Sequence, residues 1–111
     1  MMNFDYVKKA TTVTIFGEQH EIPTKTAFFV NETSRIYKEI NSATDAVKQT
    51  EATLRGIALY LGEEFVKEHF PEDVSEVDTD YVGALWIFLN NASTEATKEV
   101  IRKYAPKQLS K

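Results

Sequence analysis

The chain has 111 residues and a formal net charge of −4 at pH 7, with 42% hydrophobic, 12% aromatic and 27% charged residues. This length suffices for one domain but not for two ordinary ones, and the balance of apolar and charged residues is that of a globular protein. The negative charge argues against a general nucleic-acid binder. The absence of cysteine excludes disulfides, thiol catalysis and thiolate metal sites, and fits a reducing cytosol.

The N-terminal residues do not resemble a signal peptide, because 1–6 has neither a basic start nor an apolar run. The longest apolar stretch, 83–89, is too short to span a bilayer. We therefore expect a cytoplasmic protein without membrane contact. We treat 1–111 as a single domain with a loose N-terminal arm (about 1–10) and a loose C-terminal tail (about 106–111).

The only convincing β pattern lies near the N-terminus. Residues 13–22 alternate apolar and polar side chains around Gly17, which can adopt the positive φ of a tight turn, and Pro23 ends the pattern. The sequence therefore predicts one antiparallel hairpin at about 12–22. A two-stranded hairpin is marginal in water and has open edges, so it must lie on helices of its own chain, on another chain, or on both.

Helical periodicity follows the hairpin. A first helix is predicted at about 25–40 and a second at about 43–61. We expect Ser42 to cap the second helix because an acid, Asp45, follows three residues later. Gly56 lies inside this second helix at a cost in helix propensity, so we expect it to allow close packing against a neighbouring element.

Further helices are predicted in the C-terminal half. In chain order, these are a short helix at 63–70 that ends before Pro71, a helix at 80–90 capped by Asp78 or Thr79, and a last helix capped by Ser93 or Thr94 that ends near residue 105. An acidic loop separates the first two of these helices. The predicted fold class is mainly α (α+β), with an N-terminal β-hairpin followed by about four to five helices.

No metal site is predicted. His20 and His69 are the only histidines, and neither has a partner at ligand spacing, so we interpret both as solvated. Glu68 is adjacent to His69, and adjacent side chains diverge on a helix. Segment 78–89 begins like a calcium loop but ends in Leu89, where a bidentate glutamate is needed.

No active site is predicted either. The sequence has no nucleophile elbow, no phosphate-binding loop and no dinucleotide fingerprint. Nothing in the spacing of its 17 carboxylates selects an acid–base pair. We therefore expect no catalytic residue, no cofactor and no enzyme activity.

The large aromatic side chains favour a binding function instead. Phe28 and Phe29 are adjacent on a predicted helix and cannot both face one core. Large aromatics are enriched at interface anchors, although a compact helical domain also uses such residues in its core. The candidate partner-binding residues are Phe16, Phe28, Phe29, Tyr60, Trp86 and Phe88.

The charge is distributed unevenly along the chain. Segment 63–80 is strongly acidic, whereas segment 98–111 is basic. If the two segments meet between neighbouring chains, the contact is head-to-tail and makes rings or open spirals. Pairing within one chain, or exposure on opposite surfaces, are the alternatives. We expect a homo-oligomer.

The order of elements, the acidic charge, the length and the absence of cysteine resemble the small tail-assembly chaperones of long-tailed bacteriophages. In that family a short strand pair often follows the pattern apolar-x-apolar-x-Gly-x-x-x-x-Ile-Pro. The corresponding residues here are Val13-Thr14-Ile15-Phe16-Gly17-Glu18-Gln19-His20-Glu21-Ile22-Pro23. The resemblance implies a non-enzymatic accessory protein, absent from the finished tail, that coats the helical tape-measure protein and keeps it soluble until the tube polymerises.

Two other classes stay open. One is another small phage or bacterial structural or adaptor protein, such as a tail-completion protein or an inhibitor. The other is a small acidic DNA-binding regulator, whose recognition helix would use Lys98, Arg102 and Lys103. These cations also complement the negative end of a helix dipole. A very long helical reading frame just downstream of the gene would favour the chaperone.

Overall fold

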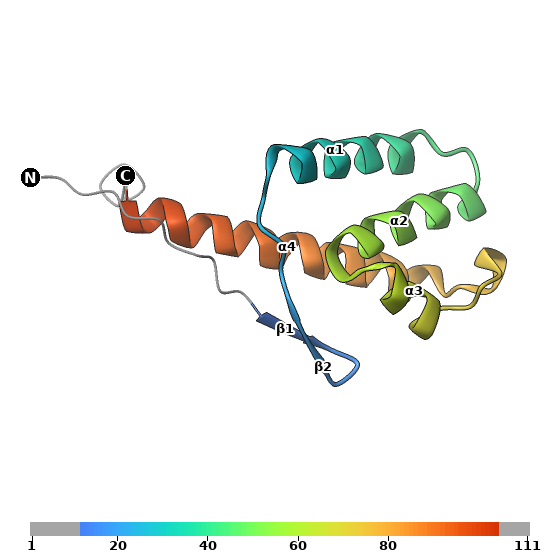
Figure 1. Cartoon of the computed structure of the whole chain (residues 1–111). Helices are drawn as coiled ribbons and strands as arrows, with labels where there is room; N and C mark the ends of the chain where they lie inside the picture. The colour runs from blue at the N-terminus through green and yellow to red at the C-terminus, as the bar shows by residue number, and fades with distance from the viewer. Residues whose placement is uncertain (1–11, 105–111) are drawn as a thin grey trace, which may run out of the picture.

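The computed structural model describes residues 12–104, and in this range the chain is a two-stranded hairpin followed by four α-helices (Figure 1). This confirms the predicted fold class. The predicted loose arm (about 1–10) and tail (about 106–111) lie outside the described residues. The elements are β1 (Thr12–Ile15), β2 (Glu18–Glu21), α1 (Ala27–Ser42), α2 (Ala46–Leu61), α3 (Glu63–His69), a 3₁₀ turn η1 (Val74–Glu76) and α4 (Thr79–Tyr104).

The hairpin is antiparallel and closes through a two-residue turn. Val13 pairs with His20 and Ile15 pairs with Glu18, so these four side chains share one face. The turn residues Phe16 and Gly17 both have positive φ, at 53° and 79°, which is the pattern of a type I′ turn. The predicted role of Gly17 is confirmed, whereas the sequence did not indicate that Phe16 also adopts a positive φ.

Helix α2 is the centre of the fold, because α1, α3, η1 and α4 all pack against it. Ile57 of α2 and Leu89 of α4 are completely buried. The C-terminal half of α4 extends beyond α1 and the hairpin (Figure 1). Asp78 caps the other end of α4, since its Oδ1 accepts hydrogen bonds from the backbone N–H groups of Asp80 and Tyr81 at 3.0 and 3.2 Å.

Gly56 and Trp86 bring α2 and α4 unusually close together. A Cβ atom on Gly56 would lie 2.4 Å from Cζ3 of the Trp86 ring, closer than any real contact allows. The Trp86 ring also meets Tyr60 of α2 and Tyr37 of α1, at centroid distances of 6.0 and 5.4 Å. The prediction that Gly56 allows close packing is confirmed, and its partner is an aromatic ring.

The predicted cap of α2 was wrong. Ser42 is the last residue of α1, and its hydroxyl donates back to the carbonyl of Glu39 at 3.4 Å. Asp45 caps α2 instead, with its carboxylate accepting from the backbone N–H of Lys48 at 2.8 Å. Because α1 runs two residues past its expected end, the chain needs the short connection 43–45 before a new helix can begin.

The predicted break before a last helix was also wrong, because α4 is one continuous helix of 26 residues. Ser93 and Thr94 lie in its middle rather than at a cap. The Asn90 amide donates to the Trp86 carbonyl at 2.8 Å, and the Thr94 hydroxyl donates to the Asn90 carbonyl at 2.9 Å. The side chains of Asn90 and Thr94 are thus accommodated inside the helix by hydrogen bonds to the preceding turn.

We predict opposite effects for alanine at two helical glycines. Gly56→Ala places a methyl group inside the Trp86 ring and should destabilise the fold by about 1–3 kcal/mol. Gly83→Ala, in α4, meets no atom within 4 Å and should stabilise the fold by up to about 1 kcal/mol through helix propensity. Urea titration followed by circular dichroism measures both. A Gly56→Ala variant as stable as Gly83→Ala would contradict the close packing of α2 and α4.

Candidate functional site

The six aromatic residues singled out from the sequence divide into a buried and an exposed set. Phe29, Tyr60 and Trp86 are buried in the core, and each residue is only 6% exposed. Phe16, Phe28 and Phe88 are 45%, 68% and 46% exposed. The prediction that Phe28 and Phe29 face different ways is confirmed, since only Phe29 enters the core.

The three buried aromatics hold α1, α2 and α4 together. Phe29 meets the Tyr60 ring edge-on at 5.1 Å, and Tyr60 in turn meets Trp86. The Tyr60 hydroxyl donates to Oδ1 of Asn90 at 2.8 Å, which satisfies its polar end. Burial raises the pKa of the Tyr60 phenol above its ordinary value, so the phenol is neutral under physiological conditions. These residues are core residues of the described chain, not accessible contacts.

Phe16 and Phe88 come together on the surface. They line a groove of about 300 Å³ between the hairpin and the N-terminal half of α4, together with Tyr81, Ala84 and Leu85. We call this feature the aromatic groove; Thr14 and Ile15 complete its lining. The rings of Phe16 and Tyr81 are stacked nearly parallel, with centroids 5.5 Å apart. Phe28, on α1, does not line this groove.

The α4 wall of the aromatic groove has the spacing of a helix contact surface. Tyr81, Ala84, Leu85 and Phe88 stand at positions i, i+3, i+4 and i+7, so their side chains form one stripe along α4. Tyr81 and Phe88 are each nearly half exposed. Apolar side chains at this spacing are those through which one helix packs against another.

Phe16 occupies a backbone conformation that bulky side chains rarely adopt. At φ 53° it stands where a type I′ turn favours asparagine or glycine. Its ring stacks on Phe65, His69 and Tyr81, with centroid distances of 5.8, 4.7 and 5.5 Å. These contacts offset a backbone cost of about 1–2 kcal/mol. The ring they hold in place is one wall of the aromatic groove.

A second apolar groove, of about 320 Å³, lies where α2, α3 and η1 meet. Its floor is formed by Leu54, Ala58, Val66 and Val74, and charged side chains of α2 and α3 form its rim. The sequence did not indicate this groove, because Val74 comes from the segment interpreted as an acidic loop.

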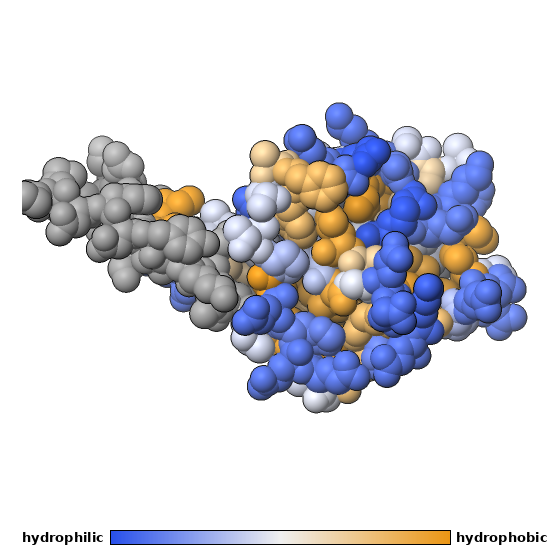
Figure 2. Space-filling model, viewed as in Figure 1, coloured by the Kyte–Doolittle hydropathy of each residue, from blue (hydrophilic) through white to orange (hydrophobic). Residues whose placement is uncertain are grey.

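Hydrophobic side chains are also exposed between hydrophilic ones on the face seen in Figure 2.

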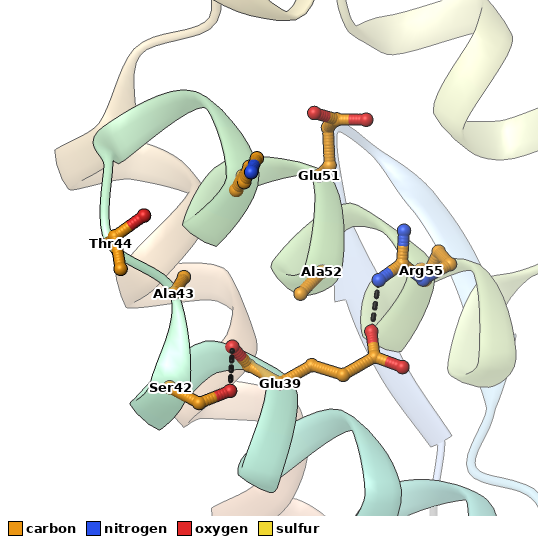
Figure 3. Close-up of a pocket in the computed structure, with 8 residues that line it drawn as sticks. Glu39, Ser42, Ala43, Thr44, Glu51, Ala52 and Arg55 are labelled. Atoms are coloured by element: carbon orange, nitrogen blue, oxygen red, sulfur yellow. Dashed lines mark hydrogen bonds and ion pairs between the residues drawn. The ribbon is translucent and has the colours of Figure 1, made fainter.

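A polar pocket of about 390 Å³ lies at the connection of α1 and α2 (Figure 3). Two of its four charged lining residues pair with each other, since the Arg55 guanidinium donates to the Glu39 carboxylate. The ion pair joins α1 to α2. An exposed ion pair contributes about 0–1 kcal/mol to stability. We therefore interpret this pocket as part of the contact between α1 and α2 rather than as a binding site.

The interpretation of both histidines as solvated was wrong. The side chains of His20 and His69 are only 17% and 19% exposed. The His69 ring lies against Phe16 and Phe65 at 4.7 and 4.5 Å, and the His20 ring meets Phe65 edge-on at 5.1 Å. Folding of the hairpin over α3 brings the two histidines together with Glu18, which no spacing in the sequence indicates.

We predict that the turn tolerates asparagine better than alanine at position 16. Both variants lose the stacked ring, but asparagine adopts positive φ more readily in a type I′ turn. Phe16→Asn should therefore be more stable than Phe16→Ala by about 1 kcal/mol. Denaturant titration of the two variants measures this difference. Equal stability would show that the backbone conformation at Phe16 carries no cost.

Comparisons with known protein families, curated proteins and solved structures found no match for this chain. Among the helices in the described range 12–104, none is both long enough and apolar enough to cross a bilayer.

Proposed function

We propose that this chain is a non-enzymatic binding protein that holds an amphipathic helix of a partner in its aromatic groove. The partner we propose is the tape-measure protein of a long-tailed bacteriophage, with this chain as its tail-assembly chaperone. The observation that carries the proposal is the grouping of Phe16, Tyr81 and Phe88, all exposed, around one groove. The resemblance of residues 13–23 to the chaperone family supplies the identity of the partner.

The composition of the groove supports an apolar, helical occupant. Exposed aromatic rings in a pocket are typical anchors of protein interfaces. The stripe Tyr81, Ala84 and Phe88 matches the spacing of a partner helix packed alongside α4. A tape-measure chain waiting for assembly presents such helices, whose apolar faces need covering.

Charge near the groove favours a partner with basic residues beside its apolar stripe. Asp78 and Asp80, both exposed, flank the start of the stripe on α4. Glu18 lies next to Phe16 at the hairpin end and is half exposed. Complementary charges of this kind set the orientation of a bound helix more than its affinity, which the apolar contact must supply.

The alternative of a DNA-binding regulator has weaker support. It requires the cations of α4 to be available on one exposed face. Lys98 lies 3.5 Å from the carboxylate of Glu95, one turn earlier on the same helix. The chain therefore neutralises part of its own basic surface, and the net charge of −4 opposes approach to DNA.

The position of the charges along α4 supports a head-to-tail oligomer. Asp80 and Arg102 lie near opposite ends of this helix, about 33 Å apart at 1.5 Å per residue. A continuous helix keeps these ends apart, so they cannot pair within one chain. We propose that acidic and basic ends meet between neighbouring chains, which would give a ring or spiral around a long client.

We predict that the aromatic groove carries client binding. The chain should be co-expressed, as wild type, Phe88→Asp and Phe28→Asp, with a phage tape-measure protein, which we expect a long helical reading frame just downstream of the gene to encode. Phe88→Asp places a charge in the groove and should weaken binding at least about tenfold. Phe28→Asp is the matched control, because Phe28 is exposed outside the groove. Affinity is read by co-purification and calorimetry; equal loss in both variants, or binding unaffected by Phe88→Asp, would refute this site.

We also predict a salt-sensitive oligomer. Light scattering at low ionic strength should give a mass above the 12.7 kDa of one chain, and the mass should fall as salt screens the charged ends. A mass that stays at 12.7 kDa up to high micromolar concentration would exclude the oligomer. An oligomer indifferent to salt would exclude the charged contact while keeping self-association.

A further inference from the structure

We propose that Glu18, Glu68 and His69, with His20 as a fourth ligand, form a binding site for a divalent transition-metal ion of the Zn²⁺ type. Glu18 and His20 belong to β2, and Glu68 and His69 belong to α3. The inference does not rest on the proposed chaperone function, because it concerns a different ligand and shares only Glu18 with the charges near the aromatic groove.

Three of the four proposed donors already lie close enough to share one ion, and the fourth, His20, lies beside one of them, Glu18. One donor each from Glu18, Glu68 and His69 lie within 4.8 Å of one another. His69 Nε2 lies 3.6 Å from one Glu18 oxygen, and His20 Nε2 lies 3.8 Å from the other. Both distances exceed a normal hydrogen bond. They are close to the separation of about 3.4 Å between two ligands of tetrahedral Zn²⁺ with bonds of about 2.1 Å.

The two histidine nitrogens provide a second, independent observation. Nε2 of His20 and Nε2 of His69 are both buried, and neither has a hydrogen-bond partner among the described residues. A buried polar atom without a partner costs free energy, so such atoms are rare in folded proteins. Both atoms face Glu18, and a metal ion between them would give each the partner that it lacks.

Aromatic side chains hold the imidazole rings in place. The His69 ring stacks on Phe16 and also packs against Phe65. The His20 ring meets Phe65 edge-on. Rings fixed in this way are preorganised for binding, because little rotamer freedom is lost when the ion arrives. Glu18 and Glu68 are exposed, so the cluster is open to solvent on the carboxylate side and an ion can enter.

The chemistry of the donor set selects the ion. Two imidazoles and two carboxylates suit Zn²⁺ and similar divalent transition metals. Mg²⁺ and Ca²⁺ prefer oxygen ligands alone. An ion bound here would connect β2 to α3 and thus hold the hairpin, whose turn carries Phe16, against the helices.

Calorimetric titration of ZnCl₂ into chelator-treated, untagged protein tests the site. We expect one Zn²⁺ per chain, a rise in melting temperature on binding, and no comparable response to MgCl₂. His69→Gln and Glu68→Gln should each weaken Zn²⁺ binding at least about tenfold. Because Glu68 is exposed, its variant should fold normally even if His69→Gln does not. Glu64→Gln, an exposed acid on the same helix outside the cluster, is the matched control and should bind like wild type.

Two results would overturn the site. One is the absence of any Zn²⁺ binding to the folded wild-type chain at about 100 µM metal. The other concerns the variants Glu68→Gln and Glu18→Gln. If both fold and both bind Zn²⁺ with the affinity and stoichiometry of the wild type, the ion binds elsewhere.

Discussion

The contact between the Trp86 ring and the backbone of Gly56 sets the geometry of this fold. With no Cβ at position 56, α4 approaches α2 closely enough for the ring to lie on the helix backbone. Seating Trp86 also fixes the rotation of α4, so that Val82, Leu85 and Leu89 enter the core with it. The same rotation leaves Tyr81 and Phe88 half exposed on the side where the hairpin lies. The half-exposed positions of Tyr81 and Phe88 on α4 thus follow from the close contact between α2 and α4 at Gly56.

The hairpin depends on this helical scaffold. Two strands alone are marginal in water, and here their inner face rests on α3 and α4 through Ile15, His20 and the ring of Phe16. The strained backbone at Phe16 is retained because its ring joins three other rings. A ring held in this way is a rigid wall, and rigid aromatic walls bind a partner at lower entropic cost than mobile ones.

Local patterns predicted the local features of the structure well. The period-2 alternation around Gly17 located the hairpin, and helical periodicity located α1, α2 and α3 to within a few residues. Gly56 was correctly interpreted as a close-packing site. The predicted cap at Ser93 or Thr94 was misleading, because a threonine hydroxyl bonds to the preceding turn of a long helix as readily as it caps a new one.

The candidate sites depended on contacts between distant segments, which no local pattern indicates. Whether an aromatic residue was core or surface was decided by how α1, α2 and α4 pack, so Tyr60 and Trp86 could not be separated from Phe88 beforehand. The cluster of His20, His69 and Glu18 forms only when the hairpin folds over α3. Two histidines that lie far apart in the sequence thus come to share one neighbouring carboxylate, Glu18.

The most direct test of the account is to map where a helical client contacts the chain. An ¹⁵N-labelled sample should be titrated with a synthetic amphipathic helix from a phage tape-measure protein, the partner that we propose, and amide shifts should be followed by NMR. The account predicts that the largest shifts fall on the turn at Phe16 and Gly17 and on residues 81–88 of α4. Shifts concentrated on α1 around Phe28, with the turn and the start of α4 unchanged, would contradict it.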